Sequence, residues 1–336
     1  MDISKLLTTW PIAEPTQITP LQGGINNQTW RIEVADGYAY ALRILPGSED
    51  LPRIRNEAAL LYALNEKQLP FRLPLPLRAN SGDICVSFER ETGSATIATL
   101  HPFLSGSKPD RNDPIRAAQA GTALAMLDTA LAALPEQVAG QFQSLPAFGD
   151  IAHFHALVSD PLAAIEQLPV ERDLSNRVRD LLAAVIETKD DLYNRLPQQL
   201  LHRDYDPSNI LMGDSGVTAV LDFEFAGKDV RVLDLCVALG WWSFDLMGTG
   251  QEWEVIDAFG AAYVRDFPLS EAELRAIPDV LRVRDAASLV HRIGRYLVGL
   301  ESDMIIENRL KHSLWREQWL AANQERLLHH VLSWGM

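Results

Sequence analysis

Short runs of alternating hydrophobic and polar residues occupy the first hundred positions. Residues 27–34 (NQTWRIEV) and 38–45 (YAYALRIL) both alternate, and Asp36-Gly37 between them is a strong hairpin signal. Further candidate strands are 16–21, 83–90 and 94–100. The pattern therefore predicts five β-strands in the N-terminal part of the chain.

Helical spacing of apolar residues appears at 50–66 and dominates after residue 105. The predicted helices there are 114–134, 150–168, 173–196, 233–247, 251–266, 270–300 and 312–334. Pro268, Pro278 and Gly294 mark breaks or kinks, although a helix can also tolerate Gly294 in its interior. We therefore predict an α+β fold. Residues 1–104 would form a β-rich lobe and 105–336 a helical lobe, with a cleft between them.

The strand at 38–45 presents two different faces. Leu42 and Ile44 lie on one face, whereas Ala41 and Arg43 share the other. Small residues beside a cation leave room for a flat ring next to a phosphate-binding charge. An edge strand that shows Arg43 to water is the alternative, and the strand alone does not decide between them.

The helix predicted at 50–66 carries a carboxylate within its apolar stripe. Ile54, Glu57 and Leu61 fall at spacings of three and four, on one face. A carboxylate on such a face needs a partner unless it reaches water. Arg43 on the preceding strand is the obvious candidate, so the pattern favours a buried Arg43–Glu57 ion pair.

Residues 200–242 concentrate side chains suited to phosphoryl transfer. Asp204, Asn209 and Asp222 are supplied by one predicted strand–turn–strand unit. Kinase-type chemistry needs that set, because one carboxylate orients a hydroxyl while an Asn and a second carboxylate hold magnesium. A hydrolase metal cluster of His202, Asp204 and Asp206 is the less supported alternative, since no further group of ligands accompanies it.

Composition narrows the possible partners. The 336 residues carry a formal net charge of −15, which disfavours nucleic acid and anionic membrane surfaces and weakly favours a cationic or zwitterionic small molecule. Cys85 and Cys236 lie in apolar runs and are expected to be buried, reduced thiols. The chain contains neither a signal-like start nor a long uninterrupted apolar run, so we expect a soluble cytoplasmic protein.

The central motifs resemble those of the aminoglycoside phosphotransferase/choline kinase superfamily, small-molecule relatives of the eukaryotic-type protein kinases. LLHRDYDPSNILM and VLDFEFA carry the resemblance. It implies a bilobal protein-kinase-like fold that uses ATP and Mg²⁺. It also implies that Asp204 is the catalytic residue, Asn209 and Asp222 are the metal ligands, and Asp234 supports the catalytic loop.

The resemblance extends to the N-terminal part, with a hinge at 101–106. The nucleotide-binding positions that it implies are Gly23, Gly24, Ala41, Arg43, Glu57, His101 and Phe103. The Gly pair, taken alone, is equally typical of a structural turn. The family usually has Lys at the position of Arg43, which keeps the charge but changes the geometry. That departure favours a nucleotide-binding pseudokinase as an alternative, although every catalytic and metal position is filled.

Two branches of the superfamily look most similar. The run DFEFAGKDVRVLDLCVALGWW resembles choline and ethanolamine kinases, whereas the following segments, with Arg292 and Arg295, resemble type II homoserine kinases. Both branches imply a small acceptor with a primary hydroxyl and an amine. The alternative acceptor is an aminoglycoside, another antibiotic or an amino sugar.

Candidate acceptor contacts are Glu224, Trp242 and Asp245. Glu224 is a second metal ligand, an amine contact or a structural residue, and the sequence does not rank these roles. Trp241-Trp242 either packs in the core or contributes an aromatic wall for a cation. The expected partners are a nucleotide and a small acceptor, and both a monomer and a homodimer stay open.

Overall fold

The computed structural model describes residues 2–21, 28–46, 51–89, 95–139 and 146–335. The chain divides into two compact units. The strand unit comprises Met1–Lys108, Leu134–Gln141 and Asn209–Glu224, and the helical unit comprises Pro109–Ala133, Phe142–Ser208 and Phe225–Met336. The proposed nucleotide-loop residues Gly23 and Gly24 lie outside the described residues.

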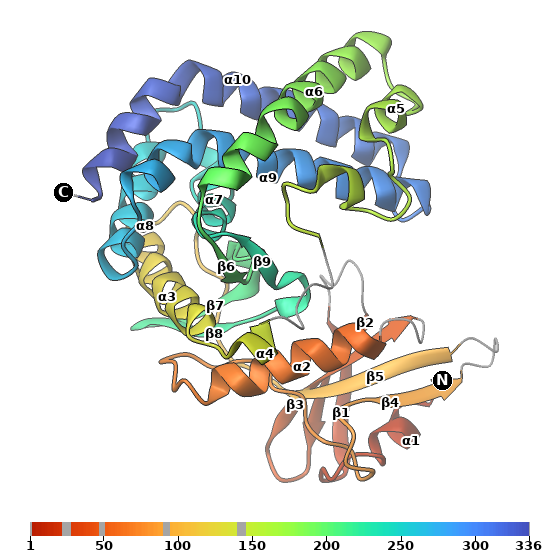
Figure 1. Ribbon diagram of the computed structural model, residues 1–336. Coiled ribbons are helices and arrows are strands. Elements are labelled where there is room, and N and C mark those ends of the chain that lie inside the picture. Colours follow the sequence, from red (N-terminus) through yellow and green to blue (C-terminus); the bar gives the residue numbers. More distant parts are fainter. Residues whose placement is uncertain (1, 22–27, 47–50, 90–94, 140–145, 336) are drawn as a thin grey trace. The chain divides into compact units, whose positions relative to one another are not determined.

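A five-stranded antiparallel sheet forms the centre of the strand unit (Figure 1). Its strands are β1 (Pro15–Leu21), β2 (Gln28–Val34), β3 (Ala39–Pro46), β4 (Val86–Glu89) and β5 (Ala95–Pro102), in the order β1-β2-β3-β5-β4. Alternation of apolar and polar residues placed all five strands correctly to within a few residues. The predicted α+β class with a five-stranded N-terminal part is confirmed.

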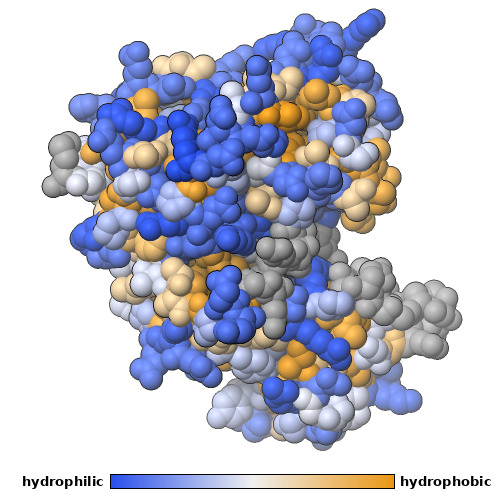
Figure 2. Space-filling view, in the orientation of Figure 1, coloured by the Kyte–Doolittle hydropathy of each residue, from blue (hydrophilic) through white to orange (hydrophobic). Residues whose placement is uncertain are grey.

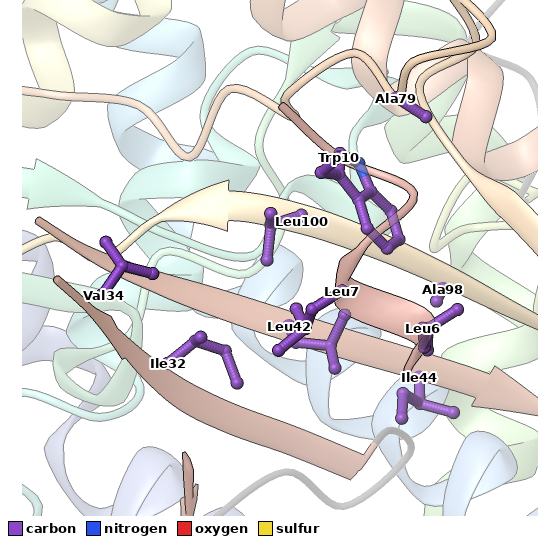
Figure 3. Close-up of a cluster of buried hydrophobic side chains, with 10 residues drawn as sticks. All are labelled: Leu6, Leu7, Trp10, Ile32, Val34, Leu42, Ile44, Ala79, Ala98 and Leu100. Atoms are coloured by element: carbon purple, nitrogen blue, oxygen red, sulfur yellow. The ribbon is translucent and has the colours of Figure 1, made fainter. Parts of the chain in front are cut away.

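Helices cover both faces of this sheet, because β3 carries buried apolar residues on each face. Leu42 and Ile44 pack under α1 (Ile3–Leu7), where Leu6 and Leu7 join them in a buried cluster (Figure 3). On the opposite face, Leu45 packs against α2 (Leu51–Asn65). The predicted division of β3 into two faces is therefore confirmed, and Arg43 lies on the face that α2 covers.

A β-hairpin from the middle of the chain belongs to the strand unit. Its strands are β7 (Ile210–Gly213) and β8 (Gly216–Val220), between the short helical turns η2 (Pro207–Asn209) and η3 (Phe223–Phe225). Backbone hydrogen bonds from the Arg72 amide to the Thr218 carbonyl (2.8 Å) and from the Ser107 amide to the Met212 carbonyl (3.0 Å) attach it. The short helix α4 (Glu136–Ala139) completes the unit.

The helical unit is built on long amphipathic helices. Its elements are α3 (Pro114–Ala132), η1 (Ile151–His153), α5 (Pro161–Glu166), α6 (Arg172–Arg195), β6 (Gln198–Leu201), β9 (Gly227–Val230), α7 (Leu233–Leu239), η4 (Phe244–Leu246), α8 (Glu252–Asp266), α9 (Glu271–Leu297) and α10 (Asp303–Ser333). In Figure 1, α9 and α10 run beside each other, and they pack together.

Three predictions for the helices need correction. Residues 150–168 do not form one helix, because Asp160 caps a new helix that starts at Pro161. Helix α10 begins at Asp303 rather than at 312, and its first turns bury Ile306 and Leu310 on one face. Residues 233–247 do not form one helix, because α7 ends at Leu239 and Phe244–Leu246 forms the separate turn η4.

Polar residues dominate the face of the protein shown in Figure 2, and apolar residues are scattered between them. The described helices include none that is both long and apolar enough to cross a lipid bilayer. Cys85 and Cys236 are free and buried, as predicted.

Candidate active site

Arg43 and Glu57 form an ion pair beneath α2. The Arg43 Nη1 atom lies 3.2 Å from the Glu57 Oε1 atom, and both side chains are largely buried. Burial by α2 removes both groups from water, so each needs the other. The predicted Arg43–Glu57 pair is confirmed as a structural feature, whereas its role in nucleotide binding stays a prediction.

Asp222 lies beside the same guanidinium. The Arg43 Nη2 atom is 3.7 Å from Asp222 Oδ1 and 3.8 Å from Glu224 Oε2. Burial, and then the neighbouring Glu224 charge, raise the pKa of Asp222 to about 7, and Arg43 offsets part of that shift. The Asp222 backbone is left-handed, with φ of 60°, which costs a non-glycine residue about 1–3 kcal/mol. Such strain is typical of functional positions.

Arg53 completes this charged cluster, and sequence reasoning missed it. Its Nη1 atom is 3.0 Å from Glu224 Oε2, and the Glu224 side chain is only 6% exposed. Arg53 and Glu57 are four residues apart and therefore share one face of α2. That spacing was the available signal. The cluster contains two guanidinium groups and three carboxylates, so it retains an excess negative charge.

Asn209 is brought close to the Asp222 segment by the β7–β8 hairpin. The Leu221 amide donates to the Asn209 carbonyl at 2.8 Å. Asp222 Oδ1 is buried and has no hydrogen-bond donor among the residues that the structure describes. A carboxylate oxygen without a donor, on a segment adjoining Asn209, suits a hard cation such as Mg²⁺, which binds few protein ligands and keeps water or phosphate oxygens.

The described ranges contain no cluster of three or more His, Cys, Asp or Glu side chains arranged to hold a metal. A metal cage made only of such protein ligands is therefore not available in these ranges. The arrangement fits a magnesium ion that is shared with a phosphate group, and the predicted hydrolase-type cluster of His202, Asp204 and Asp206 receives no support.

The predicted hinge lies at the end of β5. His101 pairs with Ala41 in the sheet register, and the Phe103 amide donates to the Ala39 carbonyl at 2.9 Å. His101 Nδ1 lies 2.7 Å from the Pro74 carbonyl oxygen and Nε2 lies 2.9 Å from Thr99 Oγ1. Burial and the Arg43 charge lower the pKa of His101 to about 3, so the ring is neutral and has a structural role.

The catalytic loop belongs to the helical unit, where Asp234 holds its backbone. The His202 and Arg203 amides donate to the two Asp234 carboxylate oxygens at 2.8 and 2.6 Å. The Asp204 amide in turn donates to His202 Nδ1 at 3.2 Å. The structure thus confirms that Asp234 supports the loop, while the catalytic role of Asp204 stays a prediction.

Arg203 anchors the loop from the inside. Its guanidinium is buried and donates to the Phe225 carbonyl at 2.7 Å and to the Pro146 carbonyl at 2.9 Å, and it lies 3.5 Å from Asp229. A Cβ atom at Gly227 would overlap this guanidinium. The loop therefore depends on a buried cation that the sequence motif alone did not assign.

A second buried carboxyl group lies under Asp234. Asp128, on α3, accepts a hydrogen bond from the Tyr263 hydroxyl at 2.7 Å and has no exposed surface. Burial raises the pKa of Asp234 to about 6. Burial and the Asp234 charge raise the pKa of Asp128 well above its usual range. The two carboxyl groups interact directly, and the raised pKa of Asp128 favours its protonated form as the donor of a hydrogen bond to Asp234.

Asp128 was overlooked because it lies in an Ala/Leu-rich helix, LAMLDTALAAL. A lone carboxylate within such an apolar run was the signal that could have identified it.

The predicted acceptor residues fall in different environments. Trp242 has no exposed surface and packs against Phe259, with ring centroids 5.7 Å apart, so its side chain belongs to the core. Asp245 is exposed and pairs with Arg111 through two contacts of 2.7 and 2.5 Å. Neighbouring Trp241 is half-buried. Of the two tryptophans, Trp241 alone has surface available to a ligand.

A model of the phosphotransferase enzyme family matches residues 17–272. The chain belongs to this family. The predicted resemblance and the predicted class, a small-molecule kinase, are confirmed. The matched range includes both the Arg43–Glu57 pair and the catalytic loop.

The individual relatives have low sequence identity to this chain. A homoserine kinase from Phenylobacterium zucineum (strain HLK1) is 29% identical over 290 residues, which cover 82% of this chain and 79% of that protein. The structure of a microcompartment-associated aminopropanol kinase matches with a TM-score of 0.66 and 18% identity, covering 97% of this chain and 98% of that one.

An amicoumacin kinase in complex with AMP-PNP, Ca²⁺ and Ami also matches with a TM-score of 0.66. Its identity is 15%, and the match covers 93% of this chain and 92% of the other. At such low identities both structural matches establish the fold alone, and with it the kinase-like architecture.

Proposed function

We propose that this family member transfers the γ-phosphoryl group of ATP to the hydroxyl of a small, amine-bearing metabolite, with magnesium held at Asn209 and Asp222. The state of the Asp222 carboxylate carries the proposal. Its Oδ1 atom is buried without a hydrogen-bond donor among the described residues, although its neighbour Arg43 lies 3.7 Å away. A divalent cation supplies the partner that such an oxygen lacks.

In this proposal the residues of the candidate site have distinct tasks. Arg43, oriented by Glu57, contacts the phosphates. Asp204 accepts the proton of the acceptor hydroxyl while the new oxygen–phosphorus bond forms and ADP leaves. Asp234 keeps the backbone around Asp204 in one conformation through its two amide contacts. When bound, magnesium neutralises charge on the phosphate oxygens.

The acceptor is proposed from the named relatives and from charge. Homoserine and aminopropanol, which name two of the matched proteins, each combine a hydroxyl with an amine. The net charge of −15 is favourable for an acceptor with a cationic group. An antibiotic acceptor is the second candidate, since amicoumacin names another protein with this fold.

A coupled ADP-release assay tests the proposal. It would screen homoserine, choline, ethanolamine, 3-aminopropan-1-ol, amino sugars and aminoglycosides with magnesium-ATP. We expect turnover with a small amino alcohol and loss of that turnover when magnesium is chelated. Turnover with aminoglycosides alone would support the second candidate. Absence of magnesium-dependent turnover with every acceptor would refute an active kinase and favour a pseudokinase.

A further inference from the structure

Several arginines lie on α9 and α10, two long helices that pack together in the helical unit. Arg284 and Arg295 lie on one line of α9, eleven residues apart, and Arg292 lies beside that line. Arg309 and Arg316 lie on one line of α10, seven residues apart. These five residues form what we call the arginine cluster.

Two carboxylates are too few to balance this cluster. Asp285 lies 2.7 Å from Arg284 and 2.7 Å from Arg316. At the other end, Glu301 lies 2.6 Å from Arg292 and 3.1 Å from Arg295. Each carboxylate is therefore shared by two guanidinium groups, and positive charge exceeds negative charge among the groups in contact.

Arg309 lies between these two pairs. Its guanidinium is half-buried and makes no hydrogen bond or ion pair with the part of the chain that the structure describes. Burial and the charges of Arg292 and Arg284 lower its pKa, and the Glu301 charge offsets only part of that shift. A partly desolvated cation among other cations is unfavourable until an anion joins it.

Other nearby groups relieve only part of this excess. The Gly240 carbonyl, at the C-terminal end of α7, accepts a hydrogen bond from Arg316 Nη1 at 2.6 Å. Burial and the surrounding arginines lower the pKa of His312 to about 4, so this residue is neutral and adds no further charge. Neither group compensates Arg309.

Aromatic side chains adjoin the cluster. The Arg284 guanidinium carbon lies 4.9 Å from the centre of the Trp241 ring. His312 stacks on Phe244, with ring centroids 4.9 Å apart, and Trp241 contacts Phe244 in turn. All three aromatic residues are half-buried. The surface next to the excess charge thus offers apolar area for the methylene groups of a small molecule.

Helix α7 connects this surface to the catalytic loop. Asp234, in its first turn, holds the loop amides, and Gly240, just beyond its last turn, contacts Arg316. The six residue steps from Asp234 to Gly240 span about 9 Å of helix. On α9, His291 lies 5.6 Å from Phe225, whose carbonyl binds the loop residue Arg203. One end of the cluster, at Arg316, is therefore connected through α7 to the residue that holds the catalytic loop.

We propose that Arg309, flanked by Arg284 and Arg292, binds a carboxylate of the acceptor substrate. The inference rests on the proposed function and narrows it to acceptors that carry an anion as well as a hydroxyl and an amine. A planar carboxylate matches the guanidinium fork, and in this setting it completes the charge balance. Choline and ethanolamine lack that group and leave the cluster uncompensated.

Two acceptors that differ only in the carboxylate test the inference. L-Homoserine without its carboxylate is 3-aminopropan-1-ol. We expect kcat/KM to be about 30-fold or more higher for L-homoserine, as for other desolvated charge pairs. Arg309→Gln should remove that preference by raising KM for L-homoserine, with KM for 3-aminopropan-1-ol and for ATP unchanged. Arg309→Lys should restore part of it.

Arg282→Gln is the matched control. Arg282 is also on α9, but it pairs with Glu317 at 2.8 Å and with Asp279 at 3.2 Å, outside the cluster. The Arg282→Gln substitution should leave the preference for L-homoserine over 3-aminopropan-1-ol intact. Equal loss of both activities in Arg309→Gln, or a wild-type enzyme that prefers 3-aminopropan-1-ol, would overturn the inference while leaving the proposed kinase activity in place.

A binding measurement separates the inference from the proposed function. Trp241 lies next to Arg284, so its fluorescence should change when L-homoserine or acetate is titrated into the whole protein. If no acceptor is phosphorylated, saturable quenching that Arg309→Gln abolishes would still establish the anion site. Quenching that is absent, or unchanged in Arg309→Gln, would reject the site.

Discussion

The Arg53 guanidinium lies 3.0 Å from the Glu224 carboxylate, although 171 residues separate them along the chain. The contact joins the first turn of α2 to the segment that carries Asp222. Glu224 raises the pKa of Asp222, whereas Arg53 and Arg43 lower it. The proposed metal ligand Asp222 thus lies beside the buried Glu224 carboxylate, and Arg53 compensates part of the Glu224 charge.

Substitutions of this pair should change magnesium affinity in opposite directions. Glu224→Gln removes a negative charge beside Asp222, so we expect weaker magnesium binding. Arg53→Ala leaves that charge uncompensated, so the apparent affinity should increase. A shift of about one unit of pKa at Asp222 corresponds to roughly tenfold in affinity. Titration of activity with magnesium at saturating ATP measures both effects.

Arg55→Ala provides the control for Arg53→Ala, since Arg55 is on the same helix but pairs with Asp83 at 3.8 Å on the surface. It should leave the magnesium dependence unchanged. If Glu224→Gln and Arg53→Ala both reduced kcat without any change in that dependence, the pair would be purely structural.

Asp204→Asn should reduce kcat by a factor on the order of 100 or more, because the amide cannot accept the hydroxyl proton. Asp234 holds the backbone of the loop through the His202 and Arg203 amides, so KM for ATP should change little. Steady-state kinetics with the best acceptor from the screen measure both constants.

Asp214→Asn, at an exposed position in the β7–β8 turn, is the corresponding control and should behave as wild type. An Asp204→Asn enzyme with normal turnover would exclude Asp204 from the reaction.

Gly227→Ala should destabilise the protein, since the added methyl group would overlap the Arg203 guanidinium. Arg203 is buried and held by the Phe225 and Pro146 carbonyls, so we expect a loss of about 1–3 kcal/mol in the free energy of unfolding. Chemical denaturation followed by circular dichroism measures it.

Gly335→Ala is the matched substitution. A Cβ atom there would lie 3.5 Å from the Leu274 side chain, which is ordinary contact. Equal stability of the two variants would show that the loop tolerates movement of Arg203.

Local patterns were sufficient for the features that depend on nearby residues. The two faces of β3 follow from alternation, and the Arg43–Glu57 pair follows because a carboxylate within the apolar stripe of α2 needs a cation. The contact of Asp234 with the catalytic loop was expected from the family motif, which fixes the order of these residues along the chain.

Features that depend on tertiary packing were not predictable in the same way. Arg53 and Glu224 are charged residues of the type usually found on the surface, and only the placement of η3 near α2 buries them. The break before Pro161 required recognition of the Asp160 cap over the general Ala/Leu pattern. Similarly, the excess charge around Arg309 depends on how α9 packs on α10.

Asp128→Asn should preserve the fold and change its response to pH. The neutral amide can donate to Asp234 and accept from Tyr263, as protonated Asp128 does. Burial raises the pKa of Asp128 far above its unfolded value, so the folded wild-type protein binds the proton more tightly. That contribution to stability is complete below the unfolded pKa, near 4, and is lost as pH rises towards the folded pKa. Asparagine has no proton to lose.

The stability of wild type relative to Asp128→Asn should therefore decline as pH rises from about 5 to 8, by up to about 1.4 kcal/mol per pH unit. Thermal unfolding across this range measures the difference. Asp128→Ala should be destabilised at every pH, because Tyr263 and Asp234 each lose a partner.

Asp285→Asn is the control with the opposite sign. Arg316 and Arg284 lower the pKa of Asp285 despite its burial, so its contribution to stability is present above the unfolded pKa and is lost only in acid. Wild type should therefore have a larger free energy of unfolding than Asp285→Asn at neutral pH, and this difference should disappear below about pH 4. A parallel pH dependence for wild type and Asp128→Asn would mean that Asp128 is ionised in the folded protein, and that the catalytic loop rests on two charged carboxylates instead of one shared proton.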